Sequence, residues 1–346
     1  MNARKRSSGT VRVFGWLSAI LVMAAIVVPA ALGALNWQDV YPDEADPFVG
    51  NYKGRWCAKE EVDPDIAAQV IALGDDLYRI RLTSELFKRC PPLAEIEVKR
   101  SGDCIKFDEA GLFGEIKNGA ITGGRGSGDK FTFEMKKEPV VSPTLGAKPP
   151  EGAVVLFDGS GFDAWQDAKG WELLDGGVMM VTPLGVQLNS KQRFKDVKLH
   201  AEFRLPFMPK ARGQQRGNSG VFLQGTYEVQ VLDSYGLEGY YNECGGMYKV
   251  SAPLVNACAP PLEWQTYDIT YRAPRYGDDG KLAAYPRITV VQNGVVIQDD
   301  VELPKITAWK EVERLADPPR DAGPIQIQSH NNFIQFRNVW LVENPE

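Results

Sequence analysis

Apolar and polar residues alternate over short stretches along most of the chain, and turn signals separate these stretches. Because successive side chains of a β-strand point to opposite faces, such alternation predicts half-buried strands. Between residues 48 and 137, the turns Gly74-Asp75-Asp76 and Ser101-Gly102-Asp103 separate pairs of such runs. A small antiparallel β domain is therefore predicted, with strands at 67–73, 77–82, 96–100, 104–107 and 130–136.

From residue 153 onward the strand pattern continues, without a long amphipathic helix. Some ten runs over about 195 residues favour a β-sandwich or jelly roll. Asn293-Gly294 and Asn331-Asn332 contain residues that tolerate positive φ and are predicted hairpin turns. The predicted strands are 154–157, 177–182, 198–205, 220–224, 227–231, 264–272, 287–292, 295–298, 325–328 and 333–341.

A proline-rich stretch separates the two β regions. It covers residues 139–152, with prolines at positions 139, 143, 149 and 150. Since proline fixes φ and removes a hydrogen-bond donor, an extended linker is predicted there. The predicted domains are thus a small antiparallel β domain at residues 45–138 and a β-sandwich at residues 153–346.

The amino terminus has the layout of an export signal. Basic residues at positions 4, 5, 6 and 12 precede an uncharged stretch over residues 13–38. That order is typical of a signal peptide, with Ala31-Leu32-Gly33 as a small-x-small cleavage site. The apolar run is also long enough to cross a bilayer as an uncleaved helix. Residues 1–38 are therefore predicted to be a signal peptide or a membrane anchor. Either one makes the protein exported, with its domains periplasmic, membrane-anchored or secreted.

Composition excludes several classes of function. Thirty-nine basic against forty-five acidic residues give a net charge of −6, which is too acidic for a general nucleic-acid binder. Only two histidines occur, His200 and His330, so a multi-histidine zinc or iron site built from this chain alone is excluded. No sequence feature indicates a protein partner.

The five cysteines fit no CxxC metal pattern, and disulfides are permitted in an exported protein. Cys244 and Cys258 lie in one loop-rich region and are predicted to form a disulfide. Two of Cys57, Cys90 and Cys104 are predicted to pair as well, which leaves one thiol over.

The first polar cluster of the second domain lies on a predicted hairpin with Gly225-Thr226 as a two-residue turn. In that register Glu228 and Gln230 share a face with residues 219, 221 and 223, and Asn218 lies opposite Asp233. A carboxylate among apolar strand residues should have a raised pKa, which suits proton transfer. The plainer alternative is a Glu228 side chain on a solvated face.

The second polar cluster is predicted on a hairpin with Asn331-Asn332 as its turn. One face of this hairpin is apolar and consists of Ile325, Ile327, Ile334, Phe336 and Trp340. The other face carries three amides, an imidazole and a guanidinium: Gln326, Gln328, His330, Gln335 and Arg337. Hydroxyl-rich ligands need many oriented donors and acceptors, so this face favours carbohydrate binding over simple solvation. His200, on the strand 198–205, is expected to be exposed or to support another residue.

Seven motifs follow one another in order: 154–159, 199–204, 217–220, 227–233, 264–269, 292–295 and 336–340. Together they resemble the 3-keto-disaccharide hydrolase domain family, which was long a domain of unknown function. The resemblance covers about residues 153–343 and implies a concanavalin-like β-sandwich jelly roll with a ligand cleft on its concave sheet. Exported members are similar in also having a small β domain and a linker like that at residues 142–150.

The resemblance implies cleavage of glycosides that carry a ketone at C3 of the sugar. A C3 ketone acidifies the C2 proton, so a base can remove it, the C1 substituent leaves by β-elimination and water adds afterwards. Such a site needs a base near C2 and an electropositive group at the ketone oxygen, for which a divalent metal ion is one candidate. It does not need the carboxylate pair of ordinary glycosidases.

Carried over by position, Glu228 and His330 are the predicted acid/base or metal-contacting groups. The residues predicted to bind sugar hydroxyls or the ketone are Asn218, Gln230, Gln328 and Arg337. Ser329 departs from the family pattern, since many relatives have Asp before the histidine. If that Asp binds metal or orients the imidazole, Ser329 impairs the role. The alternative function, from a different class, is a non-catalytic carbohydrate-binding module on the same fold.

Overall fold

The computed structural model describes residues 36–57, 65–126, 131–308, 310–314 and 316–343. Within these residues the regular structure is almost entirely β, which confirms the predicted fold class. The helical elements there are α1 (Glu311–Arg314) and 3₁₀ turns at Trp37–Asp39 and Gly213–Gln215. The described part contains no helix long and apolar enough to cross a membrane. The predicted signal or anchor lies, up to residue 35, outside the described residues.

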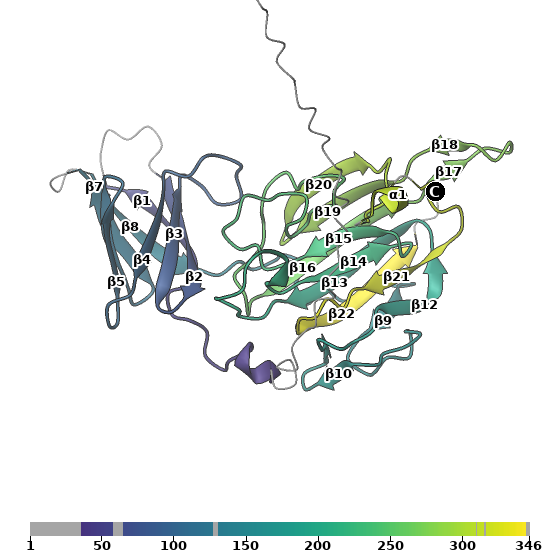
Figure 1. The fold of residues 1–346 in the computed structure, drawn as a ribbon, viewed down its shortest axis with the longest axis horizontal. Coiled ribbons are helices and arrows are strands. Elements are labelled where there is room, and N and C mark those ends of the chain that lie inside the picture. The colour runs from purple at the N-terminus through teal and green to yellow at the C-terminus, as the bar shows by residue number, and fades with distance from the viewer. Residues whose placement is uncertain (1–35, 58–64, 127–130, 309, 315, 344–346) are drawn as a thin grey trace, which may run out of the picture. The chain divides into compact units, whose positions relative to one another are not determined.

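One antiparallel sheet is formed by the first eight strands, shown in purple to blue in Figure 1. Its order is β4-β3-β2-β1-β8-β7-β6-β5, so only the central pairing of β1 with β8 joins strands distant in sequence. The remaining neighbours are hairpins, and Asp75 and Asp76 provide the left-handed residues of one turn. The strands are β1 (Gly50–Trp56), β2 (Asp65–Gly74), β3 (Leu77–Thr83), β4 (Ala94–Lys99), β5 (Ile105–Glu109), β6 (Leu112–Lys117), β7 (Ala120–Arg125) and β8 (Thr132–Glu138).

The later strands, teal to yellow in Figure 1, form two further antiparallel sheets and a small hairpin. The larger sheet has the order β10-β11-β22-β13-β16-β19-β20, with β9 also paired to β22. Its strands are β9 (Val154–Phe157), β10 (Trp171–Leu174), β11 (Val178–Val181), β13 (Val197–Arg204), β16 (Trp264–Arg272), β19 (Arg287–Gln292), β20 (Val295–Glu302) and β22 (Ile334–Glu343). The small hairpin is β17 (Arg275–Tyr276) with β18 (Leu282–Ala284).

The smaller sheet has four strands in the order β12-β21-β14-β15. They are β12 (Leu188–Phe194), β14 (Ser219–Leu223), β15 (Tyr227–Val231) and β21 (Gly323–Ile327). The two sheets pack face to face as a sandwich, with Tyr227 of β15 against Tyr271 of β16 at a ring distance of 5.8 Å. Because successive side chains of a strand point to opposite faces, Glu228 and Gln230 lie on the outer face of the smaller sheet. His200 and Glu202 lie on the outer face of the larger sheet.

The hairpin of β14 and β15 has a three-residue loop instead of the predicted two-residue turn. Leu223 pairs with Tyr227, and Gln224 and Gly225 both adopt positive φ, of 51° and 63°. The predicted register was therefore wrong by one residue, and such a slip moves one strand's side chains to the other face. Phe222, not Val221, shares the face of Glu228.

The predicted hairpin between residues 325 and 340 is also wrong, because β21 and β22 belong to different sheets. Strand β21 pairs with β12 and β14, whereas β22 pairs with β9, β11 and β13. Both strands turn apolar residues into the sandwich, so the chain crosses from one sheet to the other. Their polar faces consequently point to opposite outer surfaces, and Arg337 does not share a face with His330.

The proline-rich linker is bound to the outer face of the larger sheet. Ser142 Oγ lies 2.6 Å from Thr266 Oγ1, and Thr144 Oγ1 donates to Asp268 Oδ2 at 2.6 Å. The Gly146 N–H donates to Glu202 Oε1 at 2.6 Å. The segment contains no strand or helix, but it is not extended throughout, because residues 143–146 form a turn in which the Ala147 N–H donates to the Thr144 carbonyl at 2.9 Å. Its specific hydrogen bonds to the sheet were not indicated by its composition.

All five cysteines are free thiols in the structure, so the predicted disulfide between Cys244 and Cys258 is not present there. Both thiols are buried and already hydrogen-bonded. Cys244 Sγ lies 3.2 Å from the Tyr267 hydroxyl and accepts from Gln292 Nε2 at 3.3 Å. Cys258 Sγ donates to the Ala259 carbonyl at 3.4 Å.

Candidate active site

A cavity of about 440 Å³ lies on the outer face of the four-stranded sheet. It is lined by Gln214, Asn218, Phe222, Glu228, Gln230, Tyr248, Thr307, Ala308, Gln328 and His330. Five of the six residues predicted from the sequence are in this set, and Arg337 is not. The cavity therefore brings the predicted residues together although the pairings used to predict them were partly wrong.

Cross-strand register explains how these side chains converge. In the β14–β15 pairing Phe222 lies opposite Glu228, and Gly220 lies opposite Gln230. The Gln328 N–H donates to the Gly220 carbonyl at 2.9 Å. Gln328, just after β21, therefore lies beside Gly220, as Gln230 does on the other side. Residues opposite one another across a sheet have neighbouring side chains on the same face.

The Glu228 carboxyl is the buried ionisable group of the cavity. The residue is only 7% exposed, and burial raises its pKa to about 8. Within the described residues no hydrogen bond reaches the carboxyl group, while the backbone N–H donates to Thr307 Oγ1 at 2.7 Å. Gly220 provides the space: a Cβ there would lie 3.0 Å from Glu228 Cγ. The predicted pKa rise is thus confirmed, and Glu228 is not on a solvated face.

The amide side chains are fixed by one another. Gln230 Nε2 donates to Asn218 Oδ1 at 2.8 Å and to the Ser219 carbonyl at 3.0 Å. Asn218 Nδ2 in turn donates to the Gln214 carbonyl at 2.8 Å. Gln328 differs, because its Oε1 is buried and has no hydrogen-bond partner within the described residues. An unpaired buried acceptor costs free energy until a donor reaches it.

His330 is exposed and lines the cavity from the loop after β21. The backbone of the preceding Ser329 is fixed by Gln187, which accepts from its N–H at 3.1 Å and donates to its carbonyl at 3.0 Å. Asn331 follows with a φ of 59°, so the chain turns sharply after the imidazole.

Arg337 has a structural role on the other sheet. Its Nε donates to Glu202 Oε2 at 2.7 Å, and its guanidinium lies 4.1 Å from the Trp264 ring. Glu202 also accepts from Asn338 Nδ2 at 2.9 Å and lies 3.5 Å from His200 Nε2. The other His200 nitrogen, Nδ1, lies 2.7 Å from Asp268 Oδ1. His200 is therefore buried and paired. Of the two expectations for it, an exposed side chain is wrong, whereas a role in supporting other residues agrees with these contacts.

Sequence reasoning missed Tyr248, Phe222, Gln214 and Thr307. The correct register of β14 would have found Phe222, because it alternates with Gly220. Tyr248 comes from a loop beyond β15, where no periodic pattern indicates a direction. The isolated bridge between Met247 and Val229, and the backbone hydrogen bonds of Gln230 with Gly245 and Gly246, bring that loop to the sheet.

The described residues contain no group of three or more His, Cys, Asp or Glu side chains that could hold a metal ion. The described residues that line the cavity include one carboxyl and one imidazole, fewer than the three protein ligands of typical catalytic metal sites. The divalent metal ion suggested by the resemblance stays a prediction.

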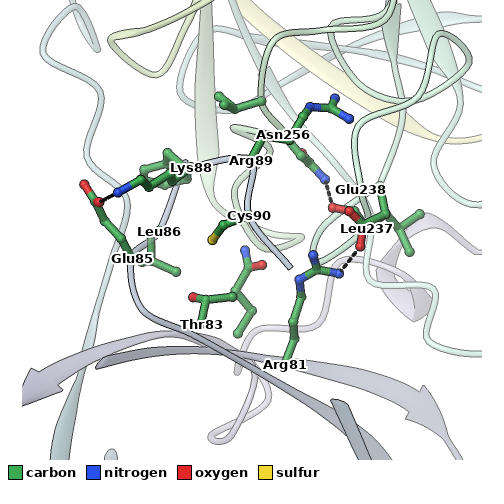
Figure 2. A pocket seen from close by; sticks show the side chains of 13 residues that line it. Arg81, Thr83, Glu85, Leu86, Lys88, Arg89, Cys90, Leu237, Glu238 and Asn256 are labelled. Carbon is green, nitrogen blue, oxygen red and sulfur yellow. Dashed lines mark hydrogen bonds and ion pairs between the residues drawn. The ribbon is translucent and has the colours of Figure 1, made fainter. Parts of the chain in front are cut away.

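A second, smaller cavity of about 30 Å³ is shown in Figure 2. Its charged side chains pair with one another: Arg81 Nη1 lies 2.6 Å from Glu238 Oε1, and Lys88 Nζ lies 3.1 Å from Glu85 Oε2. Arg89 donates to backbone carbonyls of Gly239 and Pro253 at 2.8 Å each. With room for only about one or two water molecules, it does not compete as a substrate site.

The family model of the 3-keto-alpha-glucoside-1,2-lyase-like domain matches residues 152–342, the part of the chain that forms the sandwich and its cavity. The chain belongs to this family. Membership confirms the resemblance seen in the seven motifs and gives the protein a carbohydrate-related function.

Two solved structures from Parabacteroides distasonis, each described as a candidate glycosyl hydrolase, are similar to this chain. One is 42% identical, with a TM-score of 0.52, and the match covers 56% of this chain and 85% of that one. The other is 19% identical, with a TM-score of 0.40, and covers 56% and 95%. No curated protein matches the chain.

Proposed function

We propose that the protein cleaves 3-keto-glycosides by removing the C2 proton, eliminating the C1 substituent and adding water to the resulting double bond. The observation that carries this proposal is Glu228. Among the described residues it is the one carboxyl that lines the cavity, it is buried with a raised pKa, and amide side chains line the cavity beside it. A base whose pKa lies near the working pH is effective in proton transfer. No second carboxyl lines the cavity among the described residues, which suits elimination better than the paired-carboxyl mechanism of ordinary glycosidases.

Each residue of the cavity has a role in this scheme. Glu228 is the base at C2. His330 faces the C3 ketone oxygen and donates a hydrogen bond to the negative charge that develops there. Gln230 and Asn218, fixed by their mutual hydrogen bond, bind sugar hydroxyls. The unpaired Oε1 of Gln328 accepts from a further hydroxyl, which would relieve its buried, unsatisfied state.

The test is turnover of a 3-keto-glucoside by the purified full-length chain, with and without chelator and with added divalent metal. Release of the aglycone that is lost in Glu228→Gln and His330→Ala supports the proposal. Binding without turnover under every metal condition would overturn it and would favour the non-catalytic carbohydrate-binding module. A chelator effect would show that a metal ion takes part.

A further inference from the structure

A tyrosine next to the proposed base has no role in the scheme so far. Gln230 N–H donates to the Gly246 carbonyl at 3.0 Å, and Gly245 N–H donates to the Gln230 carbonyl at 2.9 Å. Met247 forms an antiparallel bridge with Val229, so the next residue, Tyr248, comes beside Glu228. Both side chains line the same cavity.

The Tyr248 ring is supported on two sides. The edge of Tyr241 packs against it at a ring distance of 6.0 Å and an angle of 77°, and the Lys249 ammonium lies 5.6 Å from its centre. Tyr241 itself is 44% exposed and does not line the cavity. Burial, together with Tyr241 and Glu228, raises the pKa of Tyr248, so its hydroxyl keeps its proton at neutral pH.

We propose that the Tyr248 hydroxyl is the acid that protonates the departing C1 oxygen, an inference that rests on the elimination proposed above. Elimination at C1 needs such an acid, because an alkoxide is a poor leaving group. Protonation of its oxygen lets it leave as a neutral alcohol. Among the side chains that line the cavity, Glu228 is the proposed base and His330 the group at the ketone. Thr307 also has a hydroxyl, but it donates its proton to the Thr226 carbonyl at 2.8 Å. Among the described lining residues this leaves the Tyr248 hydroxyl as the acid.

Glu228 and Tyr248 together account for every proton that moves in the elimination. Glu228 takes the C2 proton, the C–H electron pair forms the C1=C2 double bond, and the C1–O pair leaves with the oxygen. Tyr248 gives its proton to that oxygen. Glu228, now protonated, returns the proton to the neighbouring Tyr248 phenolate, so both groups are restored. The products are an unsaturated 3-keto sugar and a free alcohol, without any oxidant or reductant.

The experiment compares two substrates that differ in the leaving group: methyl 3-keto-glucoside and 4-nitrophenyl 3-keto-glucoside. Nitrophenolate leaves without a proton, whereas methoxide does not. For Tyr248→Phe we expect kcat on the methyl substrate to fall by about 100-fold or more, and kcat on the nitrophenyl substrate to change less than about 5-fold, within the usual range of general acid catalysis. Tyr241→Phe is the matched control and should leave both rates near the wild-type values.

An equal loss on both substrates, or no loss on the methyl substrate, would overturn the assignment of Tyr248 while leaving the elimination intact. If the wild-type chain cleaves neither substrate, the proposed function fails first and the acid role fails with it. Circular dichroism and the melting temperature of Tyr248→Phe distinguish a lost hydroxyl from a lost fold.

Discussion

Two buried glutamates on opposite faces of the sandwich have opposite proton affinities. Glu228 on the smaller sheet and Glu202 on the larger one are 7% and 0% exposed. Burial raises the pKa of Glu228 to about 8, because nothing compensates it. Burial alone would also raise the pKa of Glu202, but hydrogen bonds from its neighbours outweigh it and lower the pKa to about 2. Partners, not burial, therefore decide whether a buried carboxyl is reactive or structural.

The same comparison separates the two histidines. Burial would lower the pKa of His200, but Asp268 and Glu202 outweigh it and raise the pKa to about 8, so the imidazole is held as a cation between carboxylates. His330 is exposed on the loop that lines the cavity. The larger sheet uses its charges to hold the linker, and the smaller sheet leaves its polar groups available to a ligand.

The largest effect is expected for Glu228→Gln, which keeps the shape of the side chain but removes the base. We expect kcat on a 3-keto-glucoside to fall by about 10³-fold, in the range of a lost general base. Steady-state kinetics measures it. Wild-type kcat/KM should also rise with pH up to about 8, as the carboxyl loses its proton.

A Glu228→Gln variant with wild-type turnover would contradict the base assignment. Thermal unfolding of the same variant is the control, because a variant that is folded and inactive separates chemistry from stability.

Glu202→Gln should lower the stability of the protein, whereas Glu228→Gln should lower its activity. Removing this carboxylate leaves the Arg337 and His200 charges with one partner fewer, which costs about 3 kcal/mol of the free energy of unfolding. Urea denaturation measures the change. Turnover per folded molecule should stay within about twofold of wild type, since Glu202 lies outside the cavity. A stable Glu202→Gln variant with lost turnover would reverse the roles assigned to the two glutamates.

The free energy of unfolding should depend on pH through the buried groups of both sheets whose pKa values are raised. His200 contributes stability fully below pH 6.5, and this contribution is lost as pH rises through about 8, which amounts to about 2 kcal/mol. Glu228 acts in the same direction, because between pH 4.5 and about 8 the folded state holds a proton that the unfolded chain has lost. We expect the free energy of unfolding to fall between pH 6 and pH 8.5.

Urea denaturation at those two pH values checks this fall. The decrease should be smaller in Glu228→Gln, in which His200 and Glu263, whose pKa burial raises to about 7, still contribute. Equal wild-type stability at both values would show that neither pKa is raised in the folded state.

Gly220→Ala is expected to have the smallest effect. The added methyl would press on Glu228 Cγ from 3.0 Å and shift the carboxyl, and we expect kcat to fall about tenfold. Kinetics of the double variant with Glu228→Gln is the decisive measurement. If Gly220 acts only through the carboxyl, the double variant should be no slower than Glu228→Gln alone. A further loss would mean that Gly220 contributes in another way.

Much of the fold followed from local pattern. Strands β9, β15, β16 and β19 have the predicted boundaries, because alternation and turn residues are properties of short segments. Strands β1, β6 and β7 were not predicted. The glycines within them, such as Gly54, Gly114 and Gly123, weaken the alternating pattern, yet each is required where a neighbouring strand approaches closely.

By itself the sequence determined the family, the all-β class and the identity of five side chains that share one cavity. Only the tertiary structure decided which sheet each of β21 and β22 joins, and thus that Arg337 lies apart from His330. It also decided that Tyr248 lies beside Glu228. The physical reason is that alternation assigns residues to faces within a strand, whereas the partner of that strand depends on burial of its apolar face against residues far away in the chain.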